Sequence, residues 1–279
     1  MHNLMIRGHC FEWGKRTYLM GILNVTPDSF SDGGEFNSLE TALNQAETMI
    51  NVGVDIIDIG GQSTRPGAEE ISLEEELNRV IPVIKVLRKT RLIPISIDTT
   101  RAAVAKAAVE AGADIVNDIS GGTFDNKMFS TVASLDVPLI LMHIRGTPKT
   151  MQNNTNYQDL LAEIYQWLQT QLEKAIKIGI DQRKLIIDPG IGFAKNHQQN
   201  IELLRHLSEF KELQCPVLVG VSRKSFLGHI LQQNDPKKRV WGTAAACCAA
   251  IAGQADILRV HDVKEIRDLI QVADAIWRS

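Results

Sequence analysis

Three polar residues, Asp98, Asn117 and Asp188, each end a short apolar run of the sequence. An acid or an amide at the end of a buried strand is costly without a partner. One of them could cap a helix, as Asp98 could. Three that meet around one cavity, however, need a ligand with several hydrogen-bond donors and acceptors. A flat amino-oxo heterocycle meets that need, because carboxylates accept hydrogen bonds and an amide does both.

Lys224 follows a later apolar run, within the segment Ser222-Arg223-Lys224-Ser225. Its ammonium group could donate a hydrogen bond to a carbonyl of the same ring. The alternative is a solvated lysine in the first turn of a helix, which is a common arrangement. Lys224 therefore adds to the heterocycle hypothesis but does not carry it alone.

A second group could bind an anion, and it consists of Arg259, His261, Asn24, Thr64 and Arg65. Arg259 and His261 are two residues apart in one run, so in a strand they share a face, and arginine is suited to phosphate. The amide oxygen of Asn24 suits Mg²⁺, which commonly takes one or two protein ligands and completes its shell with water and phosphate oxygens. Otherwise His261 is a core histidine bonded to Asp262, and Asn24 is a turn residue.

Eight short apolar runs position these residues, and each run breaks on a polar residue. The runs are 19–24, 55–58, 93–98, 114–117, 138–143, 185–188, 216–222 and 256–261. Between them lie segments with helical spacing, at 38–52, 73–90, 101–112, 126–135, 157–179, 197–208, 224–232 with 237–253, and 262–277. This alternation predicts a parallel sheet with right-handed crossovers. Eight evenly spaced units favour an α/β fold of the (β/α)8 TIM barrel type, whose catalytic residues stand at the carboxyl ends of the strands. An open doubly wound sheet would instead show a GxGxxG motif after its first strand.

The chain has 279 residues, close to the roughly 250 of one barrel, so residues 1–279 are expected to form a single domain. Residues 3–17 precede the first strand, and the polar residues 14–16 predict the turn of a short N-terminal β-hairpin that closes the bottom of the barrel. Two loops, 26–37 and 60–72, are longer than the 2–6 residues common between strand and helix. We interpret them as mobile lids over the site, although turns and helix caps use the same residue types.

Composition narrows the classes of function. The formal charge of −3 argues against the basic surface of a nucleic-acid-binding protein. No apolar stretch reaches the ~18 residues needed to cross a membrane, and the N-terminal residues lack the apolar core of a signal peptide. The four cysteines show no metal-binding spacing, so we expect free thiols in a reducing cytoplasm.

The sequence contains no GxSxG, Walker A or HExxH motif, so covalent nucleophilic catalysis is not indicated. The residues alone therefore predict a barrel enzyme with a polar heterocycle pocket beside a magnesium-assisted phosphate pocket. That pair of pockets suits the displacement of pyrophosphate from a carbon next to an electron-rich ring.

A series of motifs then reveals a resemblance that covers nearly the whole chain. The motifs are 20–34, 58–68, 96–99, 117–122, 141–151, 188–193, 222–225 and 259–263. The first two, MGILNVTPDSFSDGG and DIGGQSTRPGA, resemble the two signature motifs of dihydropteroate synthases. The resemblance implies an enzyme that joins 6-hydroxymethyl-7,8-dihydropterin diphosphate to 4-aminobenzoate. It would release diphosphate and form 7,8-dihydropteroate for folate biosynthesis.

The resemblance also implies roles for matching residues. The pterin ring would contact Asp98, Asn117, Asp188 and Lys224. Diphosphate would be held by Arg259, His261, Thr64 and Asn24, with Mg²⁺ on Asn24 and Asp32 folding toward the metal. The aminobenzoate would lie near Phe30, Arg65, Pro66, Phe193, Lys224 and Ser225. The residues acting in an SN1-like loss of diphosphate would be Asn24, Lys224, Arg259 and His261. A cytoplasmic homodimer formed through the late helices, and competition by sulfonamides for the aminobenzoate site, are further implications.

One position departs from the family pattern. Gln62 stands where the family usually has Glu, so a charge is lost in the second loop. Two alternative functions remain. A non-catalytic pterin-binding paralogue would have lost loop or diphosphate-binding residues. A pterin-dependent methyltransferase barrel would need neither the loop motifs nor the pair Arg259 and His261. This chain retains Thr64, Arg65, Arg259 and His261, which favours the synthase.

Overall fold

The computed structural model describes residues 2–26, 35–64 and 67–278. One parallel sheet contains the strands β3 (Tyr18–Asn24), β4 (Ile56–Gly60), β5 (Ile95–Asp98), β6 (Ile115–Asp118), β7 (Leu139–Met142), β8 (Leu185–Asp188), β9 (Leu218–Val219) and β10 (Ile257–Val260). Their order is β8-β7-β6-β5-β4-β3-β10-β9. A bridge between Ile187 and Val217 joins the two ends, and the Ile187 amide donates to the Pro216 carbonyl at 3.0 Å. The sheet thus closes into the predicted (β/α)8 barrel.

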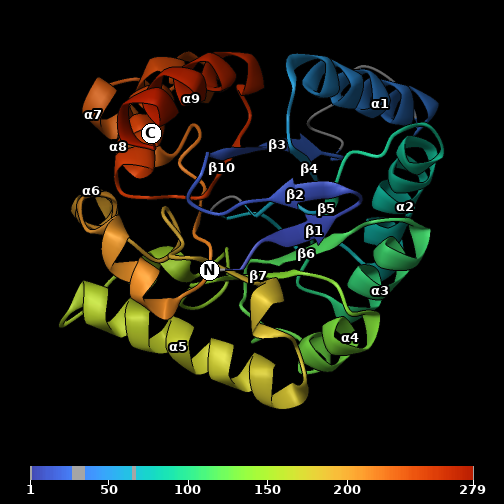
Figure 1. The fold of residues 1–279 in the computed structure, drawn as a ribbon, viewed down its shortest axis with the longest axis horizontal. Helices are drawn as coiled ribbons and strands as arrows, with labels where there is room; N and C mark the ends of the chain where they lie inside the picture. The colour runs from blue at the N-terminus through green and yellow to red at the C-terminus, as the bar shows by residue number, and fades with distance from the viewer. Residues whose placement is uncertain (1, 27–34, 65–66, 279) are drawn as a thin grey trace.

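Helices surround the barrel, as Figure 1 shows. They are α1 (Glu35–Val52), α2 (Leu73–Thr90), α3 (Ala102–Ala111), α4 (Met128–Leu135), α5 (Leu160–Ile178), α6 (His197–Arg205), α7 (Ser225–Leu231), α8 (Val240–Ala252) and α9 (Val263–Trp277). Every predicted helical segment contains a helix, with small shifts at the ends. α5 begins at Leu160 rather than at 157 because Asp159 caps it, accepting from the Ala162 amide at 3.0 Å.

Other helix ends also differ from the prediction by three residues, among them those of α1, α6 and α8. α1 begins at Glu35 rather than at 38, so it takes up part of the predicted first loop; residues 27–34 of that loop lie outside the described residues. α6 ends at Arg205 rather than at 208 and is followed by a 3-10 helix, Leu207–Leu213. These changes leave the order of strands and helices as predicted.

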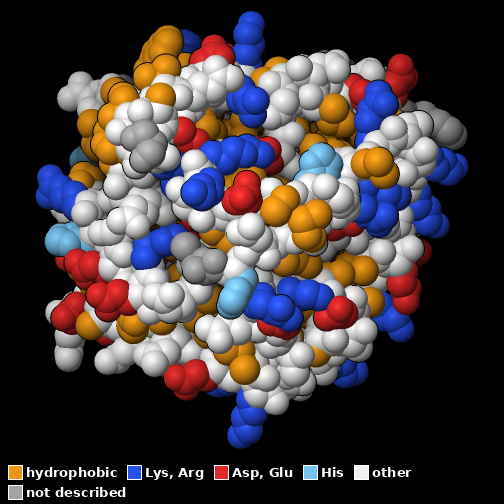
Figure 2. Space-filling model, viewed as in Figure 1, with side chains coloured by type: hydrophobic (Ala, Val, Ile, Leu, Met, Phe, Trp, Pro, Cys, Tyr) orange, Lys and Arg blue, Asp and Glu red, His pale blue; other side chains and the backbone are white. Residues whose placement is uncertain are grey.

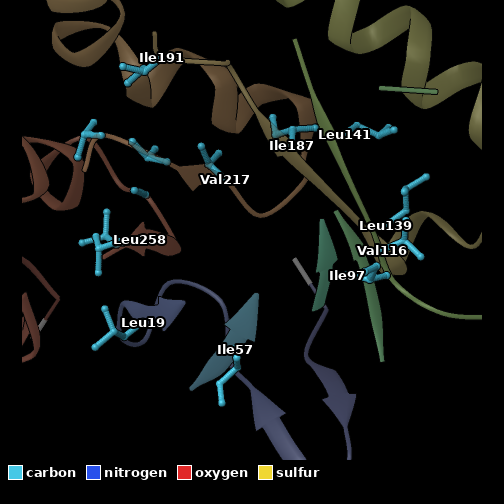
Figure 3. Packing of buried hydrophobic residues seen from close by; sticks show 14 of the residues in the cluster. Leu19, Ile57, Ile97, Val116, Leu139, Leu141, Ile187, Ile191, Val217 and Leu258 are labelled. Atoms are coloured by element: carbon cyan, nitrogen blue, oxygen red, sulfur yellow. The ribbon is translucent and has the colours of Figure 1, made fainter. Parts of the chain in front are cut away.

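Apolar side chains alternate along the strands between two packed layers. Leu19, Ile57 and Val116 belong to the layer between the strands and the helices, seen in Figure 3. Tyr18 and Met20 belong to a second layer inside the barrel. This is the period-two rule of a strand, and burial on both faces is expected where helices cover a parallel sheet.

The N-terminal hairpin plugs one end of the barrel. Its strands β1 (Leu4–Ile6) and β2 (His9–Phe11) pair antiparallel, and Figure 1 shows them lying across the barrel. Leu4, Ile6 and Phe11 share the interior layer with residues at the beginnings of the barrel strands. The hairpin therefore seals the end opposite to the carboxyl ends of the strands, where the predicted site lies.

The predicted position of the hairpin turn, 14–16, was wrong. The turn is at Arg7 and Gly8, whose φ angles are 50° and 78°. A two-residue hairpin turn with positive φ at both positions fits the twist of the strands, and glycine adopts such angles freely. Arg7 is fixed in this turn by an ion pair with Asp114, a long-range contact that no local pattern reveals.

Two expectations from composition can be checked in the described part of the chain. No helix there has both the length and the apolar character needed to cross a lipid bilayer. All four cysteines are free, as predicted, and Cys215 and Cys247 are buried.

Candidate functional site

Strand register brings the predicted polar residues into one row. Asn24 pairs with Gly60, Gly60 with Asp98, and Asp98 with Asn117 across four neighbouring strands. Asp188 ends β8 on the other side of β7. All lie at the carboxyl ends of the strands, so the heterocycle group predicted from the sequence does meet around one barrel mouth.

Gly60 keeps a gap open in this row. A Cβ atom at position 60 would lie 3.5 Å from the Asp98 Cβ and 3.8 Å from Asn24 Oδ1. The absence of a side chain leaves Asn24 and Asp98 facing a shared space at the rim of the barrel. Asn24 is half-buried there, and its amide oxygen is of the kind that Mg²⁺ binds.

The Arg259 side chain contacts Asp98, a residue of the heterocycle group. Its Nε donates to Asp58 Oδ2 at 2.6 Å and its Nη2 donates to Asp98 Oδ2 at 2.6 Å. The sequence placed Arg259 with the anion-binding residues, apart from Asp98. In the structure one guanidinium joins the two predicted groups, so they form a single site.

Asp58 is one of the residues that sequence reasoning missed. It is fully buried, and its Oδ2 also accepts from Asn117 Nδ2 at 3.2 Å. A signal for it was present, because Asp58 ends the second apolar run just as Asp98 and Asn117 end theirs.

Burial shifts the charges of this site toward neutrality. It raises the pKa of Asp98 to about 7, against the lowering effect of Arg259. It raises the pKa of Asp188 to about 6, although the Gly190 amide donates to Asp188 Oδ1 at 2.7 Å. Burial, together with the charge of Arg259, lowers the pKa of Lys224 to about 8. Perturbed groups of this kind cluster at functional sites.

Lys224 and Phe193 face each other. The Nζ atom of Lys224 lies 4.1 Å from the centre of the Phe193 ring, a cation–π distance. Ser225, the first residue of α7, follows Lys224 and is exposed. The predicted aminobenzoate neighbours Phe193, Lys224 and Ser225 are therefore close together.

A buried pair supports the Phe193 loop from behind. Lys195 is 2% exposed and His143 is 1% exposed. Lys195 Nζ lies 2.9 Å from His143 Nδ1 and donates to the Phe193 carbonyl at 2.8 Å. Burial and the neighbouring cations Lys195 and Arg145 lower the pKa of His143, so the neutral imidazole accepts from the lysine. The sequence did not single out this pair as support for the site.

His261 lies beside Ser222, with His261 Nδ1 3.0 Å from Ser222 Oγ. Both residues end neighbouring parallel segments, and the Ser222 hydroxyl also accepts from the His261 amide at 3.1 Å. Asp262, the alternative partner considered for His261, accepts from Arg223 Nε at 3.0 Å. His261 is half-buried at the rim, where a bound anion could reach it.

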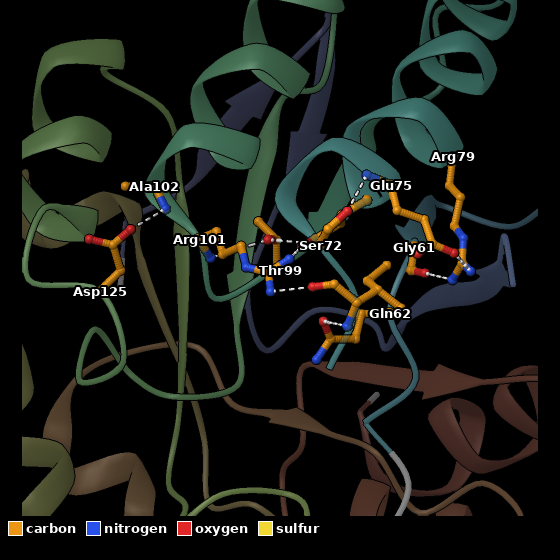
Figure 4. A network of polar contacts seen from close by, with 11 residues as sticks. Gly61, Gln62, Ser72, Glu75, Arg79, Thr99, Arg101, Ala102 and Asp125 are labelled. Atoms are coloured by element: carbon orange, nitrogen blue, oxygen red, sulfur yellow. Dashed lines mark hydrogen bonds and ion pairs between the residues drawn. The ribbon is translucent and has the colours of Figure 1, made fainter. Parts of the chain in front are cut away.

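The base of the second loop is held at both ends, as Figure 4 shows. Arg79 Nη1 donates to the Gly61 carbonyl at 2.7 Å, and Arg101 Nη2 donates to the Ile71 carbonyl at 2.6 Å. Gln62 Oε1 accepts from the Ile71 amide at 3.4 Å, which joins the two ends. The loop that carries Thr64 is thus anchored to α2 and to the segment before α3.

Glu76 links this loop base to the strand that carries Asp98. Glu76 is 2% exposed, accepts from Thr99 Oγ1 at 2.6 Å and pairs with Arg101 at 2.7 Å. A cavity of about 610 Å³ lies here, and Thr64 and Asp98 are among its lining residues. Arg65, Pro66, Phe30 and Asp32 lie outside the described residues.

The described ranges contain no cluster of three or more His, Cys, Asp or Glu side chains suited to a metal. Mg²⁺ does not require such a cluster, since it retains water and phosphate oxygens as ligands. The donor that fits the predicted ion is the amide oxygen of Asn24, which faces the gap at Gly60.

Comparisons with known proteins settle the family. A profile of the family described as pterin binding enzyme matches residues 20–261. The dihydropteroate synthase of Synechocystis sp. is 62% identical over 268 residues, which cover 96% of this chain and 93% of that protein. The chain belongs to the dihydropteroate synthase family.

Solved members of the family have the same fold. A dihydropteroate synthase from Clostridium difficile, determined in the presence of pteroic acid, is 47% identical with a TM-score of 0.91, covering 96% of this chain and 100% of that one. A Xanthomonas albilineans synthase with 4-aminobenzoic acid is 42% identical with a TM-score of 0.92, covering 98% and 97%. The TIM barrel expected from the sequence is thereby confirmed, and the family is one of enzymes, as expected.

The family departure at Gln62 can be tested directly. Gln62→Glu should leave kcat and KM within a few-fold, because the new carboxylate keeps the oxygen that accepts from the Ile71 amide. Steady-state kinetics of the two proteins measure this. A gain of about tenfold, equal to roughly 1.4 kcal/mol in the barrier, would show that the glutamine impairs the loop.

Binding of pteroic acid should depend on pH through the two buried acids. The pKa of Asp98 is raised to about 7 and that of Asp188 to about 6, and ring N–H groups bind ionised carboxylates. Affinity should therefore be highest near pH 8 and fall as the pH drops through 7 and then 6, by up to about tenfold per unit for each proton. Calorimetric titration across this range is the measurement. Affinity that rises toward acid would mean that the protonated acids are the binding form.

Proposed function

We propose that this protein condenses 6-hydroxymethyl-7,8-dihydropterin diphosphate with 4-aminobenzoate to give 7,8-dihydropteroate and diphosphate. The observation that carries the proposal is the single guanidinium of Arg259, which donates to both Asp58 and Asp98. It places a permanent cation where a heterocycle pocket and an anion pocket meet. The likeness to synthases solved with pteroic acid and with 4-aminobenzoic acid supports the same substrates here.

The heterocycle half of the site would hold the pterin. The Asp98 and Asp188 carboxylates would accept from ring and amino N–H groups, and the Asn117 amide would both donate and accept. Lys224, whose pKa is lowered to about 8 by burial, would donate to the ring carbonyl. A flat ring that uses all four groups would leave its side-chain carbon toward the rim, on the side of Arg259.

The rim would hold the leaving group. Arg259, His261 and Thr64 would donate to diphosphate oxygens, and charge-assisted bonds of this kind are strong. Asn24 would be a protein ligand of Mg²⁺, which neutralises charge on the diphosphate when bound. Arg259 is already held by Asp58 and Asp98 before any substrate binds, so it would stabilise the charge that develops on the departing oxygen.

The chemical step is a substitution at the methylene carbon. Its bond to the diphosphate oxygen breaks and the electron pair leaves with diphosphate, giving a methylene cation stabilised by the electron-rich pterin. The amino nitrogen of 4-aminobenzoate then forms the new C–N bond and loses a proton. Phe193, Lys224 and Ser225 would line the approach of the arylamine, on the side where Lys224 and Phe193 are in contact.

The decisive assay measures diphosphate release with both substrates, with Mg²⁺ present or chelated. We expect release that requires all three components and that sulfonamides, as mimics of 4-aminobenzoate, inhibit competitively. Pterin binding without any release would instead identify the non-catalytic paralogue. Diphosphate release without formation of 7,8-dihydropteroate when 4-aminobenzoate is present would exclude the synthase reaction.

In the same assay, Arg259→Ala should lower kcat by about 10²- to 10³-fold, the cost of removing one donor to a developing negative charge. Affinity for the pterin diphosphate should fall as well, because the guanidinium is used before and during the reaction. Arg183→Ala is the matched control, since the Arg183 side chain is 63% exposed and pairs with Asp181 away from the site. Unchanged kinetics of Arg259→Ala would refute the role given to Arg259.

We also propose a homodimer formed through α7, α8 and α9. These helices carry exposed apolar side chains, Ile230 (56%), Trp241 (78%), Val272 (64%) and Ile276 (60%), and Figure 2 shows hydrophobic side chains gathered over this part of the surface. α8 packs on both α7 and α9, so the side chains can form one face. An exposed apolar patch of this kind is typical of an association surface.

Sedimentation velocity tests the dimer. The wild-type chain should sediment as a dimer, and Trp241→Glu should shift it toward the monomer because it places a charge on the apolar face. Leu92→Glu is the control, since Leu92 is 71% exposed outside these helices. A wild-type monomer, or equal effects of the two variants, would contradict the assignment.

The cytoplasm is the compartment we propose. Cys10 is exposed and all four cysteines are free, and free thiols persist in a reducing compartment.

A further inference from the structure

Asp58 lies directly beneath the row of proposed pterin contacts. It stands two positions before Gly60 on β4, and Gly60 is in register with Asp98. Period-two alternation puts positions 58 and 60 on the same face of the strand, one layer apart. Asp58 is 0% exposed, whereas Asp98 and Asp188 are each 6% exposed. A substrate in the barrel mouth therefore meets the upper row, and Asp58 stays behind it.

One oxygen of Asp58 accepts hydrogen bonds from two residues of the proposed substrate site. Asp58 Oδ2 accepts from Arg259 Nε at 2.6 Å and from Asn117 Nδ2 at 3.2 Å. The first bond sets the direction of the guanidinium, whose Nη2 then reaches Asp98. The second bond fixes which way the Asn117 amide faces, since it uses the amide nitrogen and turns the oxygen elsewhere. One carboxylate thus orients a cation and an amide that would touch different parts of the substrate.

The other oxygen points to a second feature. Within the described part of the chain, Asp58 Oδ1 and Ser96 Oγ are both buried without a hydrogen-bond partner. The two residues are register partners on β4 and β5, so their side chains lie side by side on one face. A buried carboxylate oxygen beside a buried hydroxyl is the polar environment in which proteins hold an internal water molecule.

We propose that Asp58 is a positioning residue for the pterin diphosphate site, and that Asp58 Oδ1 and Ser96 Oγ bind a buried water molecule below the ring. The proposal rests on the proposed function. Asp58 acts through Arg259 and Asn117 without touching the substrate, and its negative charge keeps Arg259 shared between two acids. Without that charge the guanidinium would be attracted more strongly to Asp98 than to position 58.

The charge of Asp58 also acts on Asp98, which gives the role a readout of its own. The charged groups that act on Asp98 are Arg259 on β10, Asp58 on β4, Glu76 on α2, Asp118 on β6, and Lys224. Asp58 raises the pKa of Asp98. Removal of that charge should therefore move the acid limb of the pH profile to lower pH, an effect that loss of packing alone would not produce.

Asp58→Asn is the test, because the amide keeps the shape and an oxygen that can accept from Arg259. We expect kcat/KM for pterin diphosphate to fall about 10- to 100-fold, the usual effect of a misplaced contact, with KM for 4-aminobenzoate changed less than threefold (a limit of about 0.6 kcal/mol). The acid limb should shift to lower pH. Affinity for pteroic acid, measured by calorimetry, should fall whether or not the wild-type chain turns over, which separates this proposal from the proposed reaction.

Asp114→Asn is the matched control. Asp114 is a similarly buried aspartate that pairs with Arg7 and Arg88 and accepts from the Ile95 amide at the opposite end of the barrel. It should lower the thermal midpoint without moving the acid limb or the affinity for pteroic acid. Equal behaviour of the two variants, or an unmoved acid limb in Asp58→Asn, would overturn the proposal.

A crystal structure of the wild-type protein with pteroic acid tests the same idea without a variant that has to fold. We expect Asp58 Oδ2 to remain bonded to Arg259 and Asn117, Oδ1 to share a water with Ser96, and no ligand atom within hydrogen-bond distance of Asp58. A ligand atom on Asp58, an Arg259 turned away from it, or an Oδ1 without that water would refute the assignment.

Discussion

Arg259 is held between two buried acids, and the rest of the site depends on that arrangement. Asp58 and Asp98 are 0% and 6% exposed, and two carboxylates so deep in a barrel would be strongly unfavourable without a cation. The guanidinium supplies that cation in a planar fork that reaches both acids. It thereby allows Asp98 to remain at the mouth as an acceptor, and it places a permanent charge beside the rim where an anionic leaving group would sit.

The two ends of the barrel have different roles, one in stabilising the fold and the other in binding. At one end, the N-terminal hairpin fills the interior with Leu4, Ile6 and Phe11, so the strands close over an apolar plug. At the other end, the strands finish in polar residues that only the register brings together. An apolar plug and a polar mouth at opposite ends explain how one closed sheet can be stable and still expose several charged groups to a substrate.

The barrel fold and several residues of the candidate site could be predicted from the sequence. The residues and contacts that the sequence did not predict were missed for physical reasons. The alternation of short apolar runs with segments of helical spacing predicted the barrel, because strand and helix periodicities are both local features of the sequence. Asp98, Asn117 and Asp188 could be found because each interrupts an apolar run. Asp58 interrupts a run in the same way, but its importance arises from Arg259, which lies 201 positions further along the chain. The ion pair of Arg7 with Asp114, which stabilises the hairpin turn, and the buried contact of Lys195 with His143 are likewise long-range. Spacing along the chain carries no information about such contacts.

The most direct test of the central claim is the effect of Asp58→Asn on thermal stability in two backgrounds. In the wild-type chain the substitution removes a partner of Arg259 and should lower the thermal midpoint. Arg259→Met should itself cost about 3–5 kcal/mol, because it leaves buried acids without their cation, and in that background Asp58→Asn should raise the midpoint. If Asp58 and Asp98 share the charge of Arg259, the effect of Asp58→Asn on the thermal midpoint should change sign between the two backgrounds. The same destabilisation in both would show that Arg259 and Asp58 act independently, and would contradict the account.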